Sequence, residues 1–168
     1  MSKIIGYHGT NLRSANDIVS QKSFNYSTKS NEWLGVGVYF YELQSKANWW
    51  AKKEYDGRVL KCEIHAADDE IFNLDIPENE DFIMKFADEL KDSGNFTFSS
   101  NEKIRRCQLL DLFQTDNNHK VTIYTFPSTN PRYKNELSYF GLKRTEKQIC
   151  VHDKSCIEYN SIKILPLS

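Results

Sequence analysis

The sequence lacks the features that would place it in a membrane or on a secretory route. No stretch of its 168 residues approaches the ~20 consecutive apolar residues that a membrane-spanning helix requires. The first ten residues, MSKIIGYHGT, contain one lysine and no long apolar run, which is not the pattern of a signal peptide. We therefore expect a cytoplasmic protein with no membrane partner.

The cysteines lack a metal-binding pattern. Cys62, Cys107, Cys150 and Cys156 are scattered, without a C-x-x-C pair or a Cys/His cluster of zinc spacing. Cys62 and Cys150 lie inside apolar runs, which favours buried, reduced thiols. The sequence thus predicts no metal.

An excess of one charge is also missing. The formal net charge of -1 gives no global attraction to nucleic acid or to an anionic membrane. Any polyanionic partner must therefore be held by a local basic patch. The apolar fraction of 39% and the charged fraction of 27% describe a soluble globular protein, and the length fits a single domain over residues 1–168.

Apolar periodicity predicts a mixed succession of strands and helices. Alternation is clearest where Leu60, Cys62 and Ile64 face one side of a half-buried strand. The expected strands cover residues 4–7, 36–41, 58–65, 121–126, 148–152 and 162–165, and the expected helices cover residues 14–20, 45–53, 77–91 and 102–113. Ser14 and Ser45 are the predicted N-caps of the first two helices. This order fits an α+β domain better than a repeating βαβ sheet.

Three short segments carry the residues of most chemical interest. They are Tyr7–Thr10 (YHGT), which follows the first expected strand, Gly35–Trp50 (GVGVYFYELQSKANWW) and Gln148–Asp153 (QICVHD). A histidine at a strand end is often only a satisfied polar group. A glycine beside it lets a ligand approach the backbone, whose N–H and C=O groups can pair with a primary amide.

In this order, the three segments resemble the signature of the ADP-ribosyltransferases, in the branch with a His-Tyr-Glu triad that includes diphtheria-type toxins and poly(ADP-ribose) polymerases. The resemblance runs from residue 7 to residue 153 and implies a split, strongly bent mixed β-sheet with flanking helices and an NAD cleft. A small transferase of this kind is similar to bacterial and phage ADP-ribosylating toxins. That likeness implies a role as a toxin or defence effector, with an antitoxin as an expected partner.

The resemblance also implies roles for the first two segments. His8 would hold the ribose on the adenosine side, Gly9 would pair with the nicotinamide carboxamide through its backbone, and Thr10 would lie near the ribose. Tyr39 would stack on the nicotinamide ring, with Trp50 as a second stacking side chain. Aromatic faces suit this ring because it is flat and, in NAD, cationic.

Neighbouring residues are less regular. The polymerases have a serine where this chain has Ala47, and Ser45 is the expected substitute for its hydrogen bond. We expect Trp49 to lie in the core, and Gly35 and Gly37 to let the strand bend and admit a ligand. Arg13 would suit an RNA 2′-phosphotransferase, which holds a phosphate with basic residues.

The largest departure concerns the catalytic acid. Breaking the nicotinamide–ribose bond develops positive charge on the ribose, which a carboxylate normally stabilises. Gln148 stands where the family has a glutamate. Three interpretations stay open: Gln148 works as it stands and transfers a single ADP-ribose, Glu146 supplies the charge from the same face of the strand, or the domain binds NAD without catalysis.

A long polar segment, residues 127–147, precedes Gln148 and is expected to recognise the acceptor. Its adjacent rings, Tyr139 and Phe140, suit stacking on a nucleic-acid base, and its cations suit phosphate contacts. These cations are Arg132, Lys134, Lys143 and Arg144. A protein side chain as acceptor, and an ordinary solvated loop, are the alternatives.

The sequence therefore predicts an NAD-dependent mono-ADP-ribosyltransferase that modifies a nucleic acid or a protein. The alternatives are a catalytically inactive domain that binds NAD or ADP-ribose, and an enzyme like the RNA 2′-phosphotransferases. Tyr39 in the ring-stacking position argues against the last of these.

Overall fold

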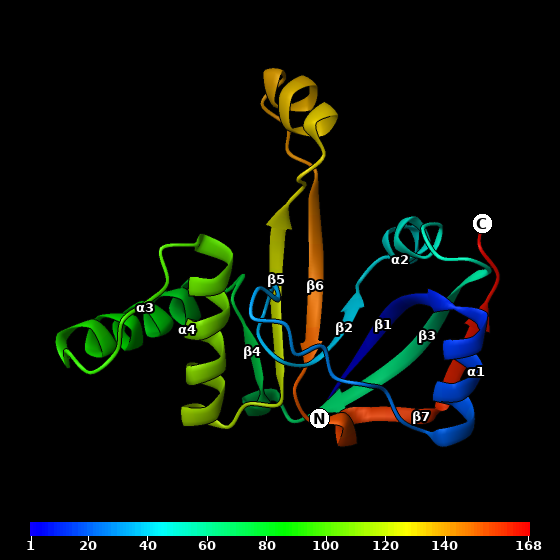
Figure 1. Cartoon of the computed structure of the whole chain (residues 1–168), viewed down its shortest axis with the longest axis horizontal. Helices are drawn as coiled ribbons and strands as arrows, with labels where there is room; N and C mark the ends of the chain where they lie inside the picture. The colour runs from blue at the N-terminus through cyan, green and yellow to red at the C-terminus, as the bar shows by residue number, and fades with distance from the viewer.

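A seven-stranded mixed β-sheet organises the chain in the computed structural model, which describes residues 1–168 (Figure 1). The strands are β1 (Ser2–Asn11), β2 (Val38–Tyr41), β3 (Gly57–Ala66), β4 (Ile71–Asn73), β5 (Val121–Pro127), β6 (Thr145–Val151) and β7 (Ile157–Leu165). Their spatial order is β4-β5-β6-β2-β1-β3-β7, and only β4 and β5 are parallel neighbours. The α+β class predicted from the sequence is confirmed.

Four helices flank this sheet: α1 (Leu12–Gln21), α2 (Gln44–Ala51), α3 (Pro77–Asp92) and α4 (Glu102–Asn117). The expected helix at 77–91 is confirmed as α3, with the proline in its first turn, where a missing N–H costs nothing. Figure 1 shows α3 and α4 beside β4, and α1 and α2 beside β1 and β3. None of the helices is both long enough and apolar enough to cross a membrane.

The first strand runs further than the sequence suggested. The expected strand ended at Tyr7, with His8 following it, whereas His8 lies inside β1. The reason is that β3 pairs with β1 along its whole length, from Ser2 opposite Ala66 to Asn11 opposite Gly57. Pairing with a long neighbour extends the strand through a histidine and a glycine that local propensity does not favour.

Both predicted N-caps are wrong by a few residues. The cap of α1 is Asn11, whose side-chain oxygen accepts a hydrogen bond from the N–H of Ser14 at 2.8 Å. The helix therefore starts before Ser14, because an asparagine caps as well as a serine. The helix α2 begins at Gln44 after Leu43, so Ser45 lies in its first turn.

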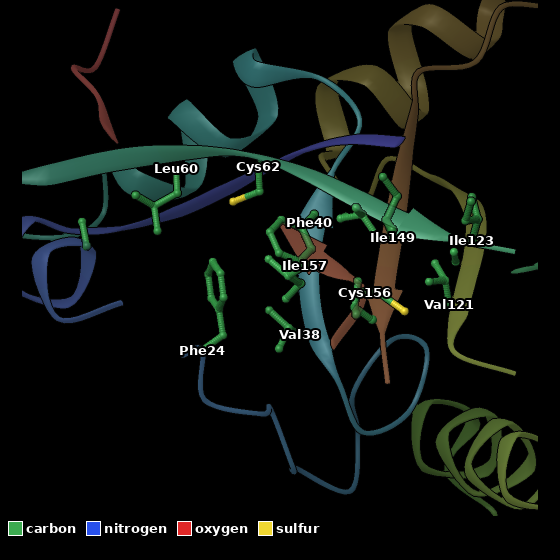
Figure 2. Packing of buried hydrophobic residues seen from close by; sticks show 14 residues of the cluster. Phe24, Val38, Phe40, Leu60, Cys62, Val121, Ile123, Ile149, Cys156 and Ile157 are labelled. Atoms are coloured by element: carbon green, nitrogen blue, oxygen red, sulfur yellow. The ribbon is translucent and has the colours of Figure 1, made fainter. Parts of the chain in front are cut away.

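The main core lies on one face of the sheet (Figure 2). The alternation predicted for β3 is confirmed, because Leu60, Cys62 and Ile64 are fully buried there. Phe24, from the segment between α1 and β2, packs edge-on against Phe40 of β2 with ring centroids 5.4 Å apart. All four cysteines are buried and unbridged, which confirms the predicted buried thiols.

A second cluster covers the opposite face, between the sheet and helices α3 and α4. Its buried members are Leu34, Phe72, Leu74, Ile83, Leu110, Phe113, Phe126 and Cys150. Strand β2 contributes to both faces: Val38 and Phe40 join the main core, and Tyr39 packs against the second cluster. This alternation fixes the direction in which each side chain of β2 points.

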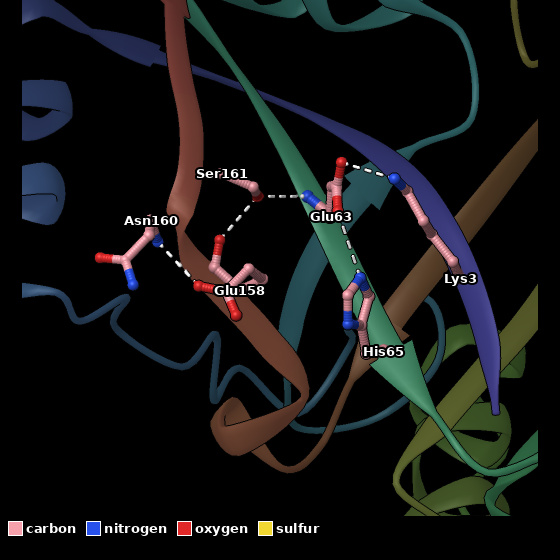
Figure 3. Close-up of polar contacts among 6 residues, drawn as sticks. All are labelled: Lys3, Glu63, His65, Glu158, Asn160 and Ser161. Atoms are coloured by element: carbon pink, nitrogen blue, oxygen red, sulfur yellow. Dashed lines mark hydrogen bonds and ion pairs between the residues drawn. The ribbon is translucent and has the colours of Figure 1, made fainter.

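A polar network fastens β7 to β3 at the far edge of the sheet (Figure 3). The pairing of β3 with β7 shifts register between Lys61 and Glu63. At this bulge, the hydroxyl of Ser161 accepts from the Glu63 N–H at 2.9 Å and donates to the Glu158 carbonyl at 2.6 Å. The register shift therefore leaves no unpaired amide at Glu63.

The contact between β1 and β2 is much shorter than that between β1 and β3. Tyr7 opposite Tyr41 is their single register pair. Strand β2 continues as a partner of β6 from Tyr41 to Val38, while β1 continues with β3. In Figure 1, β5 and β6 stand upright, and β1 and β3 slant away from them. Beyond that pair, the facing edges of β1 and β2 have no strand partner.

Candidate functional site

A cavity of about 230 Å³ lies in the gap between β1 and β2. Side chains from both faces of β2 line it, so the cavity follows the free edge of that strand. It brings together five residues that the sequence singled out, from four different elements: His8, Gly9, Tyr39, Trp50 and Gln148. We call this the first cavity.

His8 bridges the gap by a side-chain hydrogen bond. Its Nδ1 lies 2.8 Å from the carbonyl oxygen of Tyr39. Because a carbonyl can only accept, Nδ1 carries the hydrogen and Nε2 keeps a free lone pair. Burial lowers the pKa of His8 below its ordinary value, and the bond to Tyr39 opposes this shift. The imidazole is therefore neutral near pH 7 and can accept a hydrogen bond from a sugar hydroxyl.

Gly9 is required by the close approach of α2 to β1. A Cβ atom at this position would lie 2.5 Å from the carbonyl oxygen of Ala47 and 3.3 Å from Cδ1 of Trp50. Ala47 is itself fully buried at this contact. The absent side chain thus lets the ring of Trp50 lie against the Gly9 backbone, at the edge where β1 has left β2.

The ring of Tyr39 is held from its far end. Its hydroxyl accepts from the N–H of Leu34 at 2.8 Å and donates to the carbonyl of Gly35 at 2.5 Å. Burial raises the pKa of this phenol well above its usual range. Because the hydroxyl is occupied by this turn, Tyr39 can offer a ligand its ring but not a proton.

Gly35 serves the turn more than it serves a ligand. Its φ of 87° lies in the left-handed region, and the carboxylate of Asp111 occupies the space that a Cβ would need. Asp111 also accepts from the N–H of Val36 at 2.7 Å. The expectation that Gly35 admits the ligand is therefore corrected. This glycine leaves room for Asp111 of α4 to bind the turn, and Gly37 is the glycine that lines the first cavity.

Gln148 is a largely buried residue whose amide group is not sealed inside the protein. The residue is 5% exposed and lines the first cavity, and its amide atoms are not among the buried polar atoms that lack a hydrogen-bond partner. Across the strands it lies opposite Tyr41, whose pKa burial raises to about 12, with the charge of Glu146 adding to the shift. Because the residue lines the first cavity, its amide can donate or accept a hydrogen bond with a ligand there.

Glu146 lies two residues before Gln148 on β6, and its carboxylate forms an ion pair. Its carboxylate is 2.6 Å from the ammonium of Lys46 in α2, with the two side chains 25% and 13% exposed. The pair lines a second cavity of about 510 Å³, which shares Gln148 and three aromatic rings with the first cavity. The structure thus places the acid of the predicted site next to Gln148 and balances its charge with a lysine.

Sequence reasoning missed one wall of the first cavity. The segment between α1 and β2 contributes Asn25, Ser27, Lys29, Glu32 and Trp33. The hydroxyl of Ser27 donates to the carboxylate of Glu32, and Ser27 forms an isolated bridge with Gly37. The available signal was a polar run of NYSTKSNEW directly before the glycine motif, in a stretch with no predicted element.

Three of the predicted binding residues lie outside the first cavity. Thr10 is on β1 and lines neither cavity, and Ser45 lines the second. Arg13 is exposed and faces a separate hollow with Asp17 and Asp56.

The predicted acceptor residues lie on a projecting segment. Tyr139 and Phe140 are 84% and 74% exposed, and their rings meet edge-on with centroids 5.1 Å apart. Lys143 lines a small hollow nearby, and Arg144 reaches from that hollow into the second cavity. Of these four residues, Arg144 lines the second cavity, and Tyr139, Phe140 and Lys143 line neither cavity.

The expectation that Trp49 is a core residue is wrong. Its side chain is 53% exposed and lines the second cavity. The buried face of α2 consists of Ala47, Asn48 and Ala51, because only small side chains fit where the helix lies so close to β1. Both tryptophans are consequently turned outward.

Gly9→Ala tests this close packing. The added methyl group forces α2 away from β1, and overpacking of this kind costs about 1–3 kcal/mol. We expect a lower thermal midpoint, because α2 can no longer lie as close to β1. Gly94→Asn is the matched control, since nothing lies within 4 Å of a Cβ there and asparagine tolerates a left-handed φ. A thermal midpoint that does not fall in Gly9→Ala would contradict this close packing.

Comparisons with known proteins add one partial similarity. No model of a protein family matches the chain. Over 76 residues the chain is 38% identical to the uncharacterized protein MJ0359 of Methanocaldococcus jannaschii. The similarity covers 40% of this chain, and the chain spans 36% of that relative's length. The name of this relative states no activity.

Proposed function

We propose that the protein is an NAD-dependent mono-ADP-ribosyltransferase, which transfers ADP-ribose from NAD to a macromolecular acceptor and releases nicotinamide. The observation that carries this proposal is the convergence of His8, Gly9, Tyr39, Trp50 and Gln148 on one cavity. The gap between β1 and β2 supports the matching proposal for the fold, an ADP-ribosyltransferase-like split sheet.

Each wall of the first cavity suits a part of NAD. The free edge of β1 at Gly9 can pair with the nicotinamide carboxamide, which needs one donor and one acceptor. The rings of Tyr39 and Trp50 suit a flat cationic ring, for which stacking on an aromatic face includes a cation–π attraction. The bare Nε2 of His8 accepts from a ribose hydroxyl.

Gln148 and Glu146 would act where the bond breaks. When the nicotinamide–ribose bond breaks, its electron pair leaves with nicotinamide and positive charge develops on the ribose. The carbonyl oxygen of Gln148 can hold a ribose hydroxyl and turn its dipole toward that charge. Glu146 adds a carboxylate from the same face of β6, with Lys46 fixing its position.

A domain that binds NAD without turnover is the second candidate. It is favoured by the ion pair of Lys46 with Glu146, because this pair leaves no uncompensated negative charge beside Gln148. The phosphotransferase alternative gains nothing from Arg13, which lies outside both cavities.

Alanine at His8 or Tyr39 tests the proposal. We expect each variant to lower nicotinamide release from NAD, measured by chromatography, by at least ~100-fold, because each removes a wall of the cavity. His65→Ala is the control, since His65 is on β3 and lines neither cavity. Turnover that survives both substitutions rules the transferase out. Calorimetric binding of NAD by the wild type without any release would favour the non-catalytic domain.

A further inference from the structure

The second cavity adjoins the proposed NAD site, and aromatic side chains form much of its lining. Five aromatic side chains from four parts of the chain face it: Trp33, Tyr41, Trp49, Trp50 and Tyr133. We call this lining the aromatic trough. It meets the first cavity at Trp33, Tyr41, Trp50 and Gln148. A molecule in the trough therefore reaches the first cavity at the amide of Gln148.

Four of the five rings already lie beside cations. The ammonium of Lys53 lies 3.6 Å from the ring centroid of Trp49 and 4.7 Å from that of Trp50. The guanidinium of Arg144 lies 4.1 Å from the ring centroid of Tyr133, and that of Arg106 lies 5.1 Å from the ring centroid of Trp33. Trp49 and Trp50 are 53% and 46% exposed, so part of each side chain is open to a ligand.

A basic segment forms one side of the trough, and Arg144 is its basic residue in the lining. Residues 128–144, here called the arm, connect β5 to β6 and stand beyond the ends of both strands in Figure 1. The arm has four basic residues and one acidic residue, in a chain whose net charge is -1. The basic residues are Arg132, Lys134, Lys143 and Arg144, and the acidic one is Glu136. Inside the trough, Lys46 neutralises Glu146.

We propose that the aromatic trough binds an unpaired base of a single-stranded nucleic acid, with the arm holding the phosphate backbone. Aromatic rings beside cations are the usual means of binding single strands, since every base has a flat face. A protein acceptor fits less well: the basic residues of the arm repel lysine and arginine side chains, and an acidic side chain has no flat face to stack. This inference rests on the proposed transferase activity for the chemistry that follows binding.

With a base in the trough, the proposed transfer breaks one bond and forms another at the same ribose carbon. The bond from the ribose carbon to the nicotinamide nitrogen breaks, and its electron pair leaves with nicotinamide. A ring or exocyclic nitrogen of the base then donates its lone pair to the same carbon, and the proton that this nitrogen loses passes to water. The product is a base carrying one ADP-ribose.

Binding is tested without NAD, so that the result is independent of turnover. Fluorescence anisotropy is measured with a labelled mixed-sequence oligonucleotide of ~12 nucleotides, as single-stranded RNA, single-stranded DNA and duplex DNA. We expect at least one single strand to bind ~10-fold tighter than the duplex. Trp49→Ala should weaken this binding about 10-fold, because the variant removes one stacking face. Phe82→Ala is the matched control, an aromatic side chain 51% exposed on α3.

Arg144→Gln is a second variant that leaves the rings in place. It should reduce the slope of log affinity against log salt by roughly 0.7 for each phosphate that the protein no longer neutralises. The inference is overturned if the wild-type protein binds neither single strand, or if it binds the duplex as tightly as the single strands. So does undiminished binding by Trp49→Ala with an unchanged thermal midpoint.

Labelled NAD and whole lysate give the second readout. Removal of the label by nuclease digestion supports the inference, and removal by protease digestion contradicts it. If single strands bind but no label is transferred and no nicotinamide is released, the proposed function fails while the binding site stands.

Discussion

Glu146→Gln is expected to lower nicotinamide release about 100-fold, equivalent to ~2.7 kcal/mol of transition-state stabilisation. The substitution keeps the shape of the side chain and removes the carboxylate that lies beside Gln148 on β6. The ribose cation then loses a source of compensating charge, and the ammonium of Lys46 is left without its partner at the same place. Both changes disfavour positive charge in the cleft.

Gln148→Glu, added to Glu146→Gln, is expected to recover most of the missing rate. It returns a carboxylate to the cleft, at the junction of the two cavities. Glu70→Gln is the control, since Glu70 also pairs with a lysine, Lys120, at 2.7 Å but lines neither cavity. If Glu146→Gln retains more than half of the wild-type rate, Glu146 is not the compensating charge, and Glu32 in the first cavity becomes the residue to replace.

Mild acid is expected to destabilise the fold steeply. Burial lowers the pKa of His8, His119 and His152, in the case of His119 to about 4 from a usual value of 6.5. Below pH 6.5 the unfolded chain takes up protons that the folded chain refuses, so the free energy of unfolding falls as the pH falls. A histidine that stays neutral in the folded chain contributes up to about 1.4 kcal/mol per pH unit, and His119, with a pKa of about 4, stays neutral down to about pH 5.

For His119 and His152, a hydrogen-bonded chain adds to the effect of burial. The hydroxyl of Thr122 joins Nε2 of His119 to Nε2 of His152, each at 2.8 Å. His152 donates from Nδ1 to the carbonyl of Val36 at 2.7 Å, and Nδ1 of His119 is buried without any partner. A proton added to His119 would therefore have no acceptor.

Urea unfolding at pH values between about 5 and 6.5 measures this effect, because unfolded carboxyl groups take up protons mainly below this range, near pH 4. The carboxylates with lowered pKa, Glu63, Glu70 and Asp153, therefore add little to the slope within it. His119→Phe should reduce the slope by up to about 1.4 kcal/mol per pH unit, because it removes this titrating group while phenylalanine keeps the shape of a ring that packs between Phe72 and Phe113. A stability that stays level down to about pH 5 would show that the buried histidines take up protons freely in the folded chain.

Apolar alternation and a first-turn proline predicted β3 and the start of α3, because short stretches of sequence determine both. Leu60, Cys62 and Ile64 alternate because one face of β3 is buried, and Pro77 marks the start of α3 because proline suits a first turn. The extent of β1 was not predictable in this way, since pairing with β3 carries the strand through His8 and Gly9.

The site was predictable only where a motif marks it. His8, Gly9, Tyr39 and Gln148 line one cavity and come from the three segments that the sequence singled out, while their roles stay a prediction. Glu32 and Lys46 came from no pattern, because their roles depend on a bridge and an ion pair between segments far apart in the sequence. Trp49 was misplaced because a helix with alanines on its buried face looks, in sequence, as if its tryptophans should fill the core.

Between β1 and β2, the backbone is paired at one position, Tyr7 opposite Tyr41. A ligand that contacts His8 and Gly9 on one half of the sheet and Tyr39 and Gln148 on the other would form a further connection beside this pair. It would add to the connections that already join the two halves, the hydrogen bond from His8 to Tyr39 and the main core that both halves share, so occupancy of the gap is expected to raise the thermal midpoint.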